Sequence, residues 1–380
     1  RQRQMCIRDR GPFVSFANCG LPYYVSGEIA NRDSLLVQTP ESLKARFNLD
    51  VRPFHEVIQI SPEEHTVTVR HDGKEFTESY DKLILSPGAK PFVPTIEGLA
   101  EAKNAYTLRN VPDLDEIMAA LDNHPKEAVV IGAGFIGLEM AENLAKRGLQ
   151  VTIIEKAPHV LPPLDQEMAA FVQAELLANG VRVITSQSAT RFEDQGKVIV
   201  LENGQKITSD LTILSVGVEP ENGLAKAAGI ELGLRGGILV DEHYETSQKD
   251  IFAVGDAIVV KQEITGQDAL ISLASPANRQ GRQVADVIAG LGRTNKGSIG
   301  TAIVRAFDMT AASTGLSEHI LRMNQLPYKA LHVSGKDHAG YYPGATDMTL
   351  KLLFEPTTGK IYGAQGVGKK GVDKRIDILA

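Results

Sequence analysis

The most reactive side chain in the sequence belongs to a cysteine near the amino end. Only two cysteines, Cys6 and Cys19, occur among 380 residues, so a disulfide-stapled secreted scaffold is excluded and a reducing, cytoplasmic compartment is favoured. The fifth position after Cys19 is Tyr24, so Cys19 has no neighbouring thiol to pair with. We therefore expect Cys19 to alternate between a thiolate and either a mixed disulfide with an outside thiol or a sulfenic acid.

A helix beginning near Gly20 would assist this chemistry. Its amino-terminal amides would lower the pKa of the Cys19 thiol and favour the thiolate. The thiolate is the form that acts as nucleophile and accepts electrons. The alternative for Cys19 is an inert, buried thiol.

A second group of residues is suited to binding a dinucleotide. Gly132, Gly134 and Gly137 have the spacing G-x-G-x-x-G. The first permits a tight turn, the second lets the backbone approach a pyrophosphate, and the third lets a helix pack closely on a sheet. Glu155 follows Gly132 by 23 positions (155 − 132). At this spacing a carboxylate accepts hydrogen bonds from the adenosine ribose and repels the 2′-phosphate of NADPH. The pattern predicts an NADH site, with packing alone as the alternative role of the glycines.

The segments around this turn have the order of a nucleotide-binding unit. Apolar residues predict a buried parallel strand over 127–131, an amphipathic helix over 138–147 and a second strand over 150–154. Strand, glycine turn, helix, strand and acid therefore follow one another in the expected order.

The end of such a unit occurs twice in the chain. An apolar strand leads into the pattern S-x-G-x-x-P at Ser86 and Gly88, and again at Ser215 and Gly217. An Asp-Gly or Asn-Gly pair, typical of a hairpin turn, precedes each strand. The recurrence predicts two homologous nucleotide-binding halves, with chance similarity as the alternative.

The first half lacks a recognisable glycine turn. In the second half the turn precedes Ser215 by 83 residues (215 − 132), which would put the first turn near residue 3. Residues 1–10 contain no glycine and no strand pattern. We therefore expect a fragment in which a non-native leader over 1–10 replaces the first strand and turn, so that Cys6 has no function. We also expect truncation at the carboxyl end, where 373–380 is helix-like without a stop signal.

One further motif and the order of all the motifs point to a family. Gly255 and Asp256 end an extended segment, where a carboxylate can accept from flavin ribitol hydroxyls, unless the pair is a simple turn. The segment S-F-A-N-C-G-L-P-Y around Cys19, the glycine turn and A-V-G-D ending at Asp256 together resemble the pyridine nucleotide-disulfide oxidoreductases of the single-cysteine branch. Segments 37–44, 275–282 and 338–344 are most similar to coenzyme A-disulfide reductases and NADH-dependent persulfide reductases.

The resemblance covers about 11–380 and implies cofactors, a substrate and a fold. The cofactors are FAD and NADH, with NADH favoured over NADPH, and the substrate is coenzyme A disulfide or a persulfide. Together with the repeat, it predicts an α/β fold of two Rossmann-like, three-layer nucleotide-binding domains and a partial α+β dimerisation domain. The expected limits are 11–112 and 239–300 for FAD, 113–238 for NADH and 301–380 for dimerisation.

The resemblance also implies roles for individual residues. Glu139 would lie near the nicotinamide, unless it is an ordinary helix-surface acid. Lys44 or Arg46 would meet the coenzyme A phosphates, although a solvated basic face is favoured. Tyr341 or Tyr342 would contribute to catalysis in the partner subunit of a homodimer, with interface packing as the alternative. Beside Cys19, the substrate contacts would be Ser15, Asn18 and Asn278.

Composition narrows the class of function. Forty Lys and Arg against 47 Asp and Glu give a net charge of −7, which disfavours nucleic acids and anionic membrane surfaces as partners. The longest nearly unbroken apolar run covers only 128–138, against roughly 18 residues needed to span a membrane. Two alternatives to the reductase are an NADH oxidase or peroxidase in which Cys19 cycles through sulfenic acid, and an inactive fragment that binds NADH but no FAD.

Overall fold

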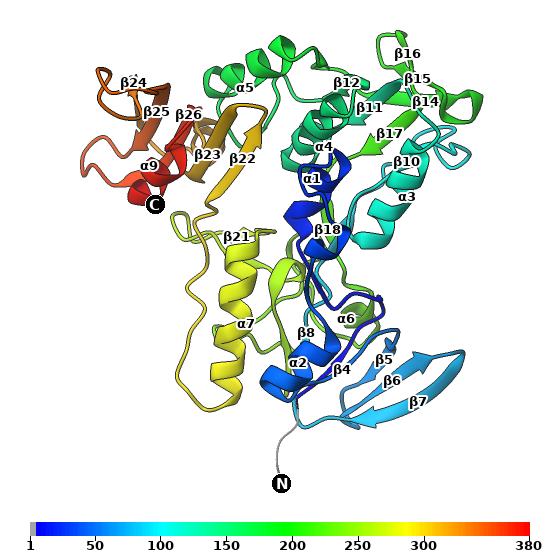
Figure 1. Ribbon diagram of the computed structural model, residues 1–380. Coiled ribbons are helices and arrows are strands. Elements are labelled where there is room, and N and C mark those ends of the chain that lie inside the picture. The colour runs from blue at the N-terminus through cyan, green and yellow to red at the C-terminus, as the bar shows by residue number, and fades with distance from the viewer. Residues whose placement is uncertain (1–4) are drawn as a thin grey trace. The chain divides into compact units, whose positions relative to one another are not determined.

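The computed structural model describes residues 5–380 and divides into two compact units (Figure 1). Unit 1 contains the described residues through Gly20, then Asn31–Lys90 and Val218–Ser298. Unit 2 contains Leu21–Ala30, Pro91–Gly217 and Ile299–Ala380. The domain limits expected from the sequence remain a prediction.

Unit 1 consists of small sheets and helices around one apolar core. Its sheets are an antiparallel meander and several strand pairs. The meander is β5 (Glu56–Ser61), β6 (Thr66–His71) and β7 (Lys74–Ser79). The pairs are β8 (Leu83–Leu85) with β19 (Ile251–Ala253), β1 (Cys6–Arg8) with β4 (Asp50–Arg52), β2 (Ser15–Phe16) with β3 (Leu36–Gln38), β20 (Val260–Lys261) with β21 (Asp268–Ala269), and β9 (Ala89–Pro91), whose last residue belongs to unit 2, with β18 (Val218–Pro220). The helices are α2 (Pro40–Phe47), α6 (Gly223–Ala227) and α7 (Ala274–Ile288). Val69, Phe252 and Val284 bring the meander, β19 and α7 into the same core.

The expectation that residues 1–10 form no strand is wrong. Strand β1 runs parallel to β4, with Cys6 opposite Asp50. The Arg8 guanidinium donates to both carboxylate oxygens of Glu78, at 2.7 and 2.8 Å. This strand is short and is held by ion pairs, so it lacks the apolar pattern by which strands are predicted. The first four positions of the expected leader lie outside the described residues.

Unit 2 contains a parallel sheet covered by helices and by a second, smaller sheet. The parallel sheet has the order β10 (Ala105–Tyr106), β17 (Leu211–Leu214), β11 (Glu127–Ile131), β12 (Gln150–Ile154) and β13 (Arg182–Ile184). Its helices are α3 (Val111–Leu121), α4 (Phe135–Lys146) and α5 (Gln166–Ala178), and the smaller antiparallel sheet is β14 (Ala189–Glu193), β15 (Val198–Leu201) and β16 (Lys206–Thr208). Helix α4 packs on β11 and β12 (Figure 1), and Phe192 and Ile199 of the smaller sheet pack against Val129 and Ile154.

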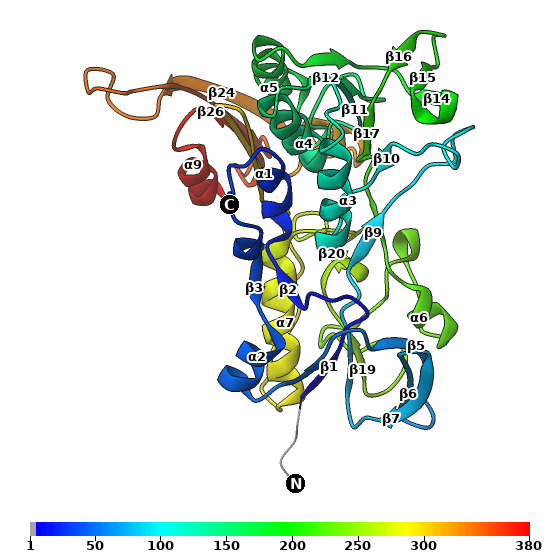
Figure 2. The same ribbon diagram turned by 45° about the vertical axis from the view of Figure 1, so that its right-hand side comes forward.

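The carboxyl-terminal part of unit 2 is an antiparallel sheet. Its strand order is β22 (Ala302–Ala306), β23 (Met309–Gly315), β26 (Ile361–Gly368), β25 (Asp347–Phe354) and β24 (Lys329–Lys336), with helices α8 (Glu318–Met323) and α9 (Val372–Leu379). Helix α9 lies beside β26 (Figure 2) and also contacts β23, and its Val372 and Ile376 are buried. The predicted strands over 127–131 and 150–154 and the predicted helix near 373–380 are confirmed.

One buried cation joins the two parts of unit 2. Lys351 on β25 is fully buried, and its ammonium contacts three carboxylates. Asp165 lies at 2.8 Å, Glu318 at 2.5 Å, and Glu167 is also in contact. The three acids lie close enough together to hold a metal ion, and the Lys351 ammonium takes that position.

Candidate active site

Cys19 lies in a turn directly after a short strand pair in unit 1. It is exposed, within the single 3-10 turn Asn18–Gly20 that follows β2. The backbone amide of Ala17 donates to Leu35 at 2.7 Å, and that of Gly20 donates to Ala17 at 2.8 Å, so this turn has a defined path. The thiol is therefore not buried within the described chain, and its reactivity remains a prediction. The helix expected near Gly20 is present only as the five residues of α1 (Leu21–Val25).

The predicted substrate contacts in unit 1 lie on four elements. Ser15 is half-buried on β2, and Asn18 is in the Cys19 turn. Lys44 and Arg46 are exposed in the last turn of α2. Asn278 is exposed on α7. Only Ser15 and Asn18 share a chain segment with Cys19, and the substrate role of all five remains a prediction.

The predicted flavin residues lie at the ends of two adjacent parallel strands. Strand β8 leads to Ser86 and Gly88, and β19 leads to Gly255 and Asp256. The φ angles of Gly88 and Gly255 are +73° and +79°, a region that favours glycine. The nearest atom to a Cβ added at Gly255 would be 3.9 Å away, so this turn has room for a ligand. Nucleotides bind at the carboxyl ends of parallel strands, and the Asp256 carboxylate can accept from hydroxyls, so these residues fit FAD.

Sequence reasoning missed a residue that supports this turn. Gln280 on α7 is only 6% exposed, and its Oε1 accepts from the Gly255 amide at 2.7 Å. Gln280 and Val284 are the buried positions of α7, one turn apart. An i, i+4 spacing of one polar and one apolar residue could have indicated an inward-facing glutamine.

The predicted NADH turn in unit 2 has two glycines that are needed for packing and one that leaves space. A Cβ at Gly132, whose φ is +103°, would lie 2.4 Å from the Ser215 carbonyl oxygen, and one at Gly137 would lie 2.0 Å from the Gly132 oxygen. No atom lies within 4 Å of a Cβ at Gly134, which is the N-cap of α4. The turn therefore offers an open, amide-lined cradle at a helix N-terminus, which fits a pyrophosphate. Helix α4 begins at Phe135, three residues earlier than predicted, because Gly137 already belongs to it.

The second S-x-G-x-x-P pattern supports the turn from the neighbouring strand. The Ser215 hydroxyl lies 3.0 Å from the Ile131 oxygen and 2.9 Å from the Gly132 oxygen, and it donates to both. Gly217 has a φ of +112°, and no atom lies within 4 Å of a Cβ added there. Gly217 was predicted as a site residue and Ser215 was not, although both belong to the same motif.

Glu155 ties the turn to the following loop. It directly follows β12, is 9% exposed, and accepts hydrogen bonds from two backbone amides: Ala133 at 2.6 Å and Ala157 at 2.7 Å. The carboxylate is thus fixed beside the glycine turn. Its bond to the adenosine ribose remains a prediction.

Glu139 is not the ordinary helix-surface acid that the sequence left open. It is half-buried on α4, and the Tyr23 hydroxyl donates to it at 3.4 Å. Burial raises the pKa of Glu139 to about 7; the Tyr23 hydrogen bond lowers it, nearby Glu142 raises it and Arg305 lowers it. This carboxyl therefore titrates near neutral pH.

Tyr341 and Tyr342 lie in the turn between β24 and β25. Their exposed fractions are 92% and 66%, and the Tyr342 amide donates to Ala339 at 2.8 Å. Large exposed aromatic rings are enriched where proteins contact one another. Their role in a partner's active site remains a prediction.

Family models settle the class of protein. The model described as pyridine nucleotide-disulphide oxidoreductase matches residues 4–281, and the model of that family's dimerisation domain matches residues 301–380. The chain belongs to this family. It is thus an oxidoreductase that uses FAD and NAD(P)H, and the predicted α/β class with a dimerisation domain is confirmed.

Three relatives refine the comparison. The crystal structure of the reduced CoADR-RHD protein of Bacillus anthracis is 49% identical, with a TM-score of 0.98 over 100% of this chain and 69% of that one. The NAD-dependent persulfide reductase of A. fulgidus is 37% identical, with a TM-score of 0.95 over 98% of this chain and 70% of that one. The coenzyme A disulfide reductase of Staphylococcus haemolyticus is 34% identical over 385 aligned positions, which cover 100% of this chain and 86% of the relative.

Both cofactors of this oxidoreductase family have a matching set of residues here. The turn around Gly134 fits the dinucleotide, and the strand ends at Gly88 and Gly255 fit the flavin nucleotide. Among residues 5–380, no helix combines the length and the apolar character needed to cross a bilayer.

Proposed function

We propose that this protein reduces coenzyme A disulfide, or a persulfide, with electrons from NADH and through Cys19. The observation that carries the proposal is an exposed cysteine without a second cysteine beside it, in the turn after β2. The other cysteine, Cys6, lies on β1. The relatives described as a coenzyme A disulfide reductase and a persulfide reductase support this choice of substrate.

The chemistry balances with one thiol. The Cys19 thiolate attacks one sulfur of coenzyme A disulfide, which forms a mixed disulfide and releases one coenzyme A thiolate. Two electrons then cleave the mixed disulfide, which releases the second coenzyme A thiolate and restores Cys19. In total, NADH and one proton reduce one disulfide to two thiols.

FAD, when bound, accepts a hydride from NADH and supplies the electron pair to the cysteine sulfur. Asp256 would accept hydrogen bonds from the hydroxyls of FAD, and the turns at Gly88 and Gly255 would lie against the nucleotide part of FAD. Gly134 would admit the NADH pyrophosphate, while Glu155 would bond to the ribose and disfavour NADPH. Ser15, Asn18 and Asn278 would contact the substrate, and Lys44 or Arg46 its phosphates.

A homodimer in the cytoplasm completes the proposal. The match to a dimerisation domain over 301–380 supports a second copy of this chain as partner, and Tyr341 or Tyr342 would reach that copy's site. NADH and a thiolate kept reduced are both features of the cytoplasm.

Mass spectrometry of Cys19 tests the proposal. The Cys6→Ser protein, loaded with FAD, is exposed to coenzyme A disulfide and separately to peroxide, with Cys6→Ser/Cys19→Ser as the control. We expect a coenzyme A adduct on Cys19 that NADH removes. Formation of sulfenic acid without any adduct would favour the oxidase or peroxidase. A protein that stays colourless and takes up no flavin would favour an inactive NADH-binding fragment.

A further inference from the structure

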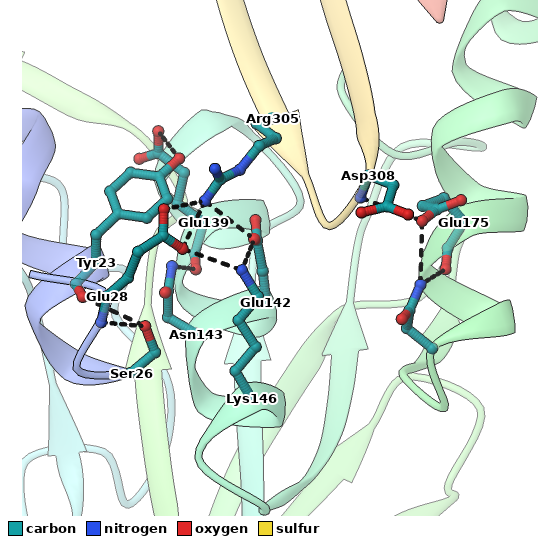
Figure 3. A network of polar contacts seen from close by, with 11 residues as sticks. Tyr23, Ser26, Glu28, Glu139, Glu142, Asn143, Lys146, Glu175, Arg305 and Asp308 are labelled. Atoms are coloured by element: carbon teal, nitrogen blue, oxygen red, sulfur yellow. Dashed lines mark hydrogen bonds and ion pairs between the residues drawn. The ribbon is translucent and has the colours of Figure 1, made fainter. Parts of the chain in front are cut away.

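A cluster of charged side chains in unit 2 connects three segments that lie far apart in the sequence (Figure 3). The segments are α1 with the turn after it, helix α4 after the NADH turn, and β22 of the dimerisation domain. The Arg305 cluster, as we call it, consists of Tyr23, Glu28, Glu139, Glu142, Lys146 and Arg305.

Arg305 makes a contact with each of the other two segments. Its Nη2 donates to both carboxylate oxygens of Glu28, at 2.7 and 2.8 Å, and lies 3.5 Å from Glu142. Its guanidinium carbon is 5.1 Å from the centre of the Tyr23 ring, within the range of a cation–π interaction. One side chain of β22 therefore holds the ring whose hydroxyl donates to Glu139.

Helix α4 contributes the other side of the cluster. Glu139, Glu142 and Lys146 follow one another at i, i+3 and i+7, so they share one face of the helix. The Lys146 ammonium donates to Glu142 at 2.6 Å and to Glu28 at 3.1 Å. Glu142 is fully buried.

The charges of the cluster do not balance. Three carboxylates, Glu28, Glu139 and Glu142, face two cations, Lys146 and Arg305. A proton on one carboxyl would balance the sum. Glu28 and Glu142 each contact both cations, whereas Glu139 is bonded to a neutral hydroxyl. Glu139 is thus the carboxyl that gains most from a proton.

The cluster is not optimised for stability. Glu142 Oε2 and Arg305 Nε are buried and form no hydrogen bond within the described chain. Buried polar atoms without a hydrogen bond destabilise a fold, and buried ion pairs contribute little net stability even when they are complete. The arrangement therefore points to control of position and charge at Glu139.

We propose that Arg305 is a positioning residue for the NADH half of the site. Through this cluster, Arg305 fixes the position of Glu139 and sets the pH range in which Glu139 holds a proton. This inference rests on the proposed function, which places Glu139 near the nicotinamide. The groups that face Glu139 come from three elements: Tyr23 and Glu28 from α1 and the turn after it, Glu142 and Lys146 from α4, and Arg305 from β22.

Direct titration of Glu139 tests the inference without turnover. The carbonyl band of its protonated form is followed by infrared spectroscopy against pH, in FAD-loaded protein, and is assigned as the band that is lost in Glu139→Gln. Arg305→Gln removes a cation and should move the midpoint upward by about one unit or more. Glu142→Gln removes an anion and should move the midpoint downward. Arg305→Lys should restore most of the original value.

The rate of flavin reduction by NADH provides the second measurement. Its pH midpoint should move in the same direction as the Glu139 titration in each variant, and Arg182→Gln, an exposed arginine on β13, should leave both unchanged. Opposite shifts in Arg305→Gln and Glu142→Gln would not result from loss of packing alone. If Arg305→Gln does not fold, Tyr23→Phe should move the Glu139 midpoint upward, because it removes a hydrogen bond to the charged form of Glu139.

Two results separate the inference from the proposed function. Folded variants whose Glu139 midpoint stays at the wild-type value would overturn the inference, even if NADH reduces the flavin normally. Shifted midpoints in a protein whose flavin NADH does not reduce would instead reject the NADH site, while the role of Arg305 in setting the Glu139 proton would stand.

Discussion

The hydroxyl oxygen of Ser215 lies 2.9 Å from the carbonyl oxygen of Gly132 and donates to it. These residues follow β17 and β11, which are neighbours in the parallel sheet. Because a Cβ at Gly132 would lie only 2.4 Å from the Ser215 carbonyl oxygen, the two loops are in contact through their backbones. The NADH turn is therefore held from the adjacent strand as well as by its own glycines.

Ser215→Ala should weaken NADH binding. Loss of the hydroxyl leaves the carbonyl groups of Ile131 and Gly132 without this donor, and one such bond is worth about 1 kcal/mol, or about fivefold in KM for NADH. Ser209→Ala is the matched control, because that buried hydroxyl donates to Leu211 at the other end of β17. The control should lower the melting temperature without changing KM. Equal KM changes in the two variants would argue against a specific role for Ser215.

Gly134→Ala and Gly137→Ala should separate binding from folding. Alanine at Gly134 meets no protein atom within 4 Å, so the fold should lose at most about 1 kcal/mol while NADH binding weakens at least tenfold. Alanine at Gly137 would place its Cβ 2.0 Å from the Gly132 oxygen, so stability itself should fall. Denaturant unfolding and NADH titration measure the two effects. Normal NADH affinity in Gly134→Ala would show that the cofactor does not approach this residue.

Glu155→Ala should reduce the preference for NADH over NADPH. The change removes the negative charge that would repel a 2′-phosphate, and it also removes the acceptor of the Ala133 and Ala157 amides. We therefore expect a higher KM for NADH and a smaller ratio of kcat/KM for NADH over NADPH. Glu155→Gln keeps the shape and one acceptor, so it should change the ratio with less effect on stability. An unchanged ratio in both variants would remove the assigned role.

Lys351→Met should destabilise unit 2 strongly. It leaves Asp165, Glu167 and Glu318 without their shared cation, and breaking a buried ion pair costs about 3 kcal/mol or more. Lys336→Met is the control, since the ion pair of Lys336 with Asp347 is exposed and should contribute less than about 1 kcal/mol. Denaturant unfolding at pH 7 measures both. Similar losses in the two variants would contradict a structural role for the buried ammonium.

The carboxylates around Lys351 should make the stability of the fold depend on pH in the acid range. Burial raises the pKa of Glu167, but hydrogen bonds, first from Lys351, outweigh burial and lower it to about 2 from an ordinary 4.5. The lowered value means that this carboxylate stabilises the fold above about pH 4.5 and loses that effect as the pH falls toward 2. Unfolding free energy measured over this range should fall less in Lys351→Met than in the wild-type protein. Parallel pH profiles would show that Lys351 is not the cause.

The NADH turn can be predicted from the sequence because its parts are contiguous. Strands β11 and β12, the three glycines and Glu155 all lie within 127–155, so their order along the chain is their order in space. The start of α4 is predicted less well, since Gly137 is both a motif residue and part of the helix. Local spacing does not distinguish these two roles.

Residues brought together by tertiary packing are not predictable in this way. Tyr23, Glu139 and Arg305 come from three distant segments, and no periodicity links them. Gln280 supports the Gly255 turn from a helix 25 residues further along. Strand β1 is held by Arg8 and Glu78, which are 70 positions apart. In each case a single polar side chain makes the contact, and the sequence around it does not indicate which residue is its partner.

Arg305 also limits how this protein can be recombined with its relatives. It lies in 301–380, which matches the dimerisation domain, while Glu28 and Glu142 precede it by 277 and 163 positions. A chimera joined at residue 300 would pair a foreign side chain with these two acids. Engineers who exchange the carboxyl-terminal module should therefore transplant all three residues together, because the boundary between sequence modules divides an electrostatic unit.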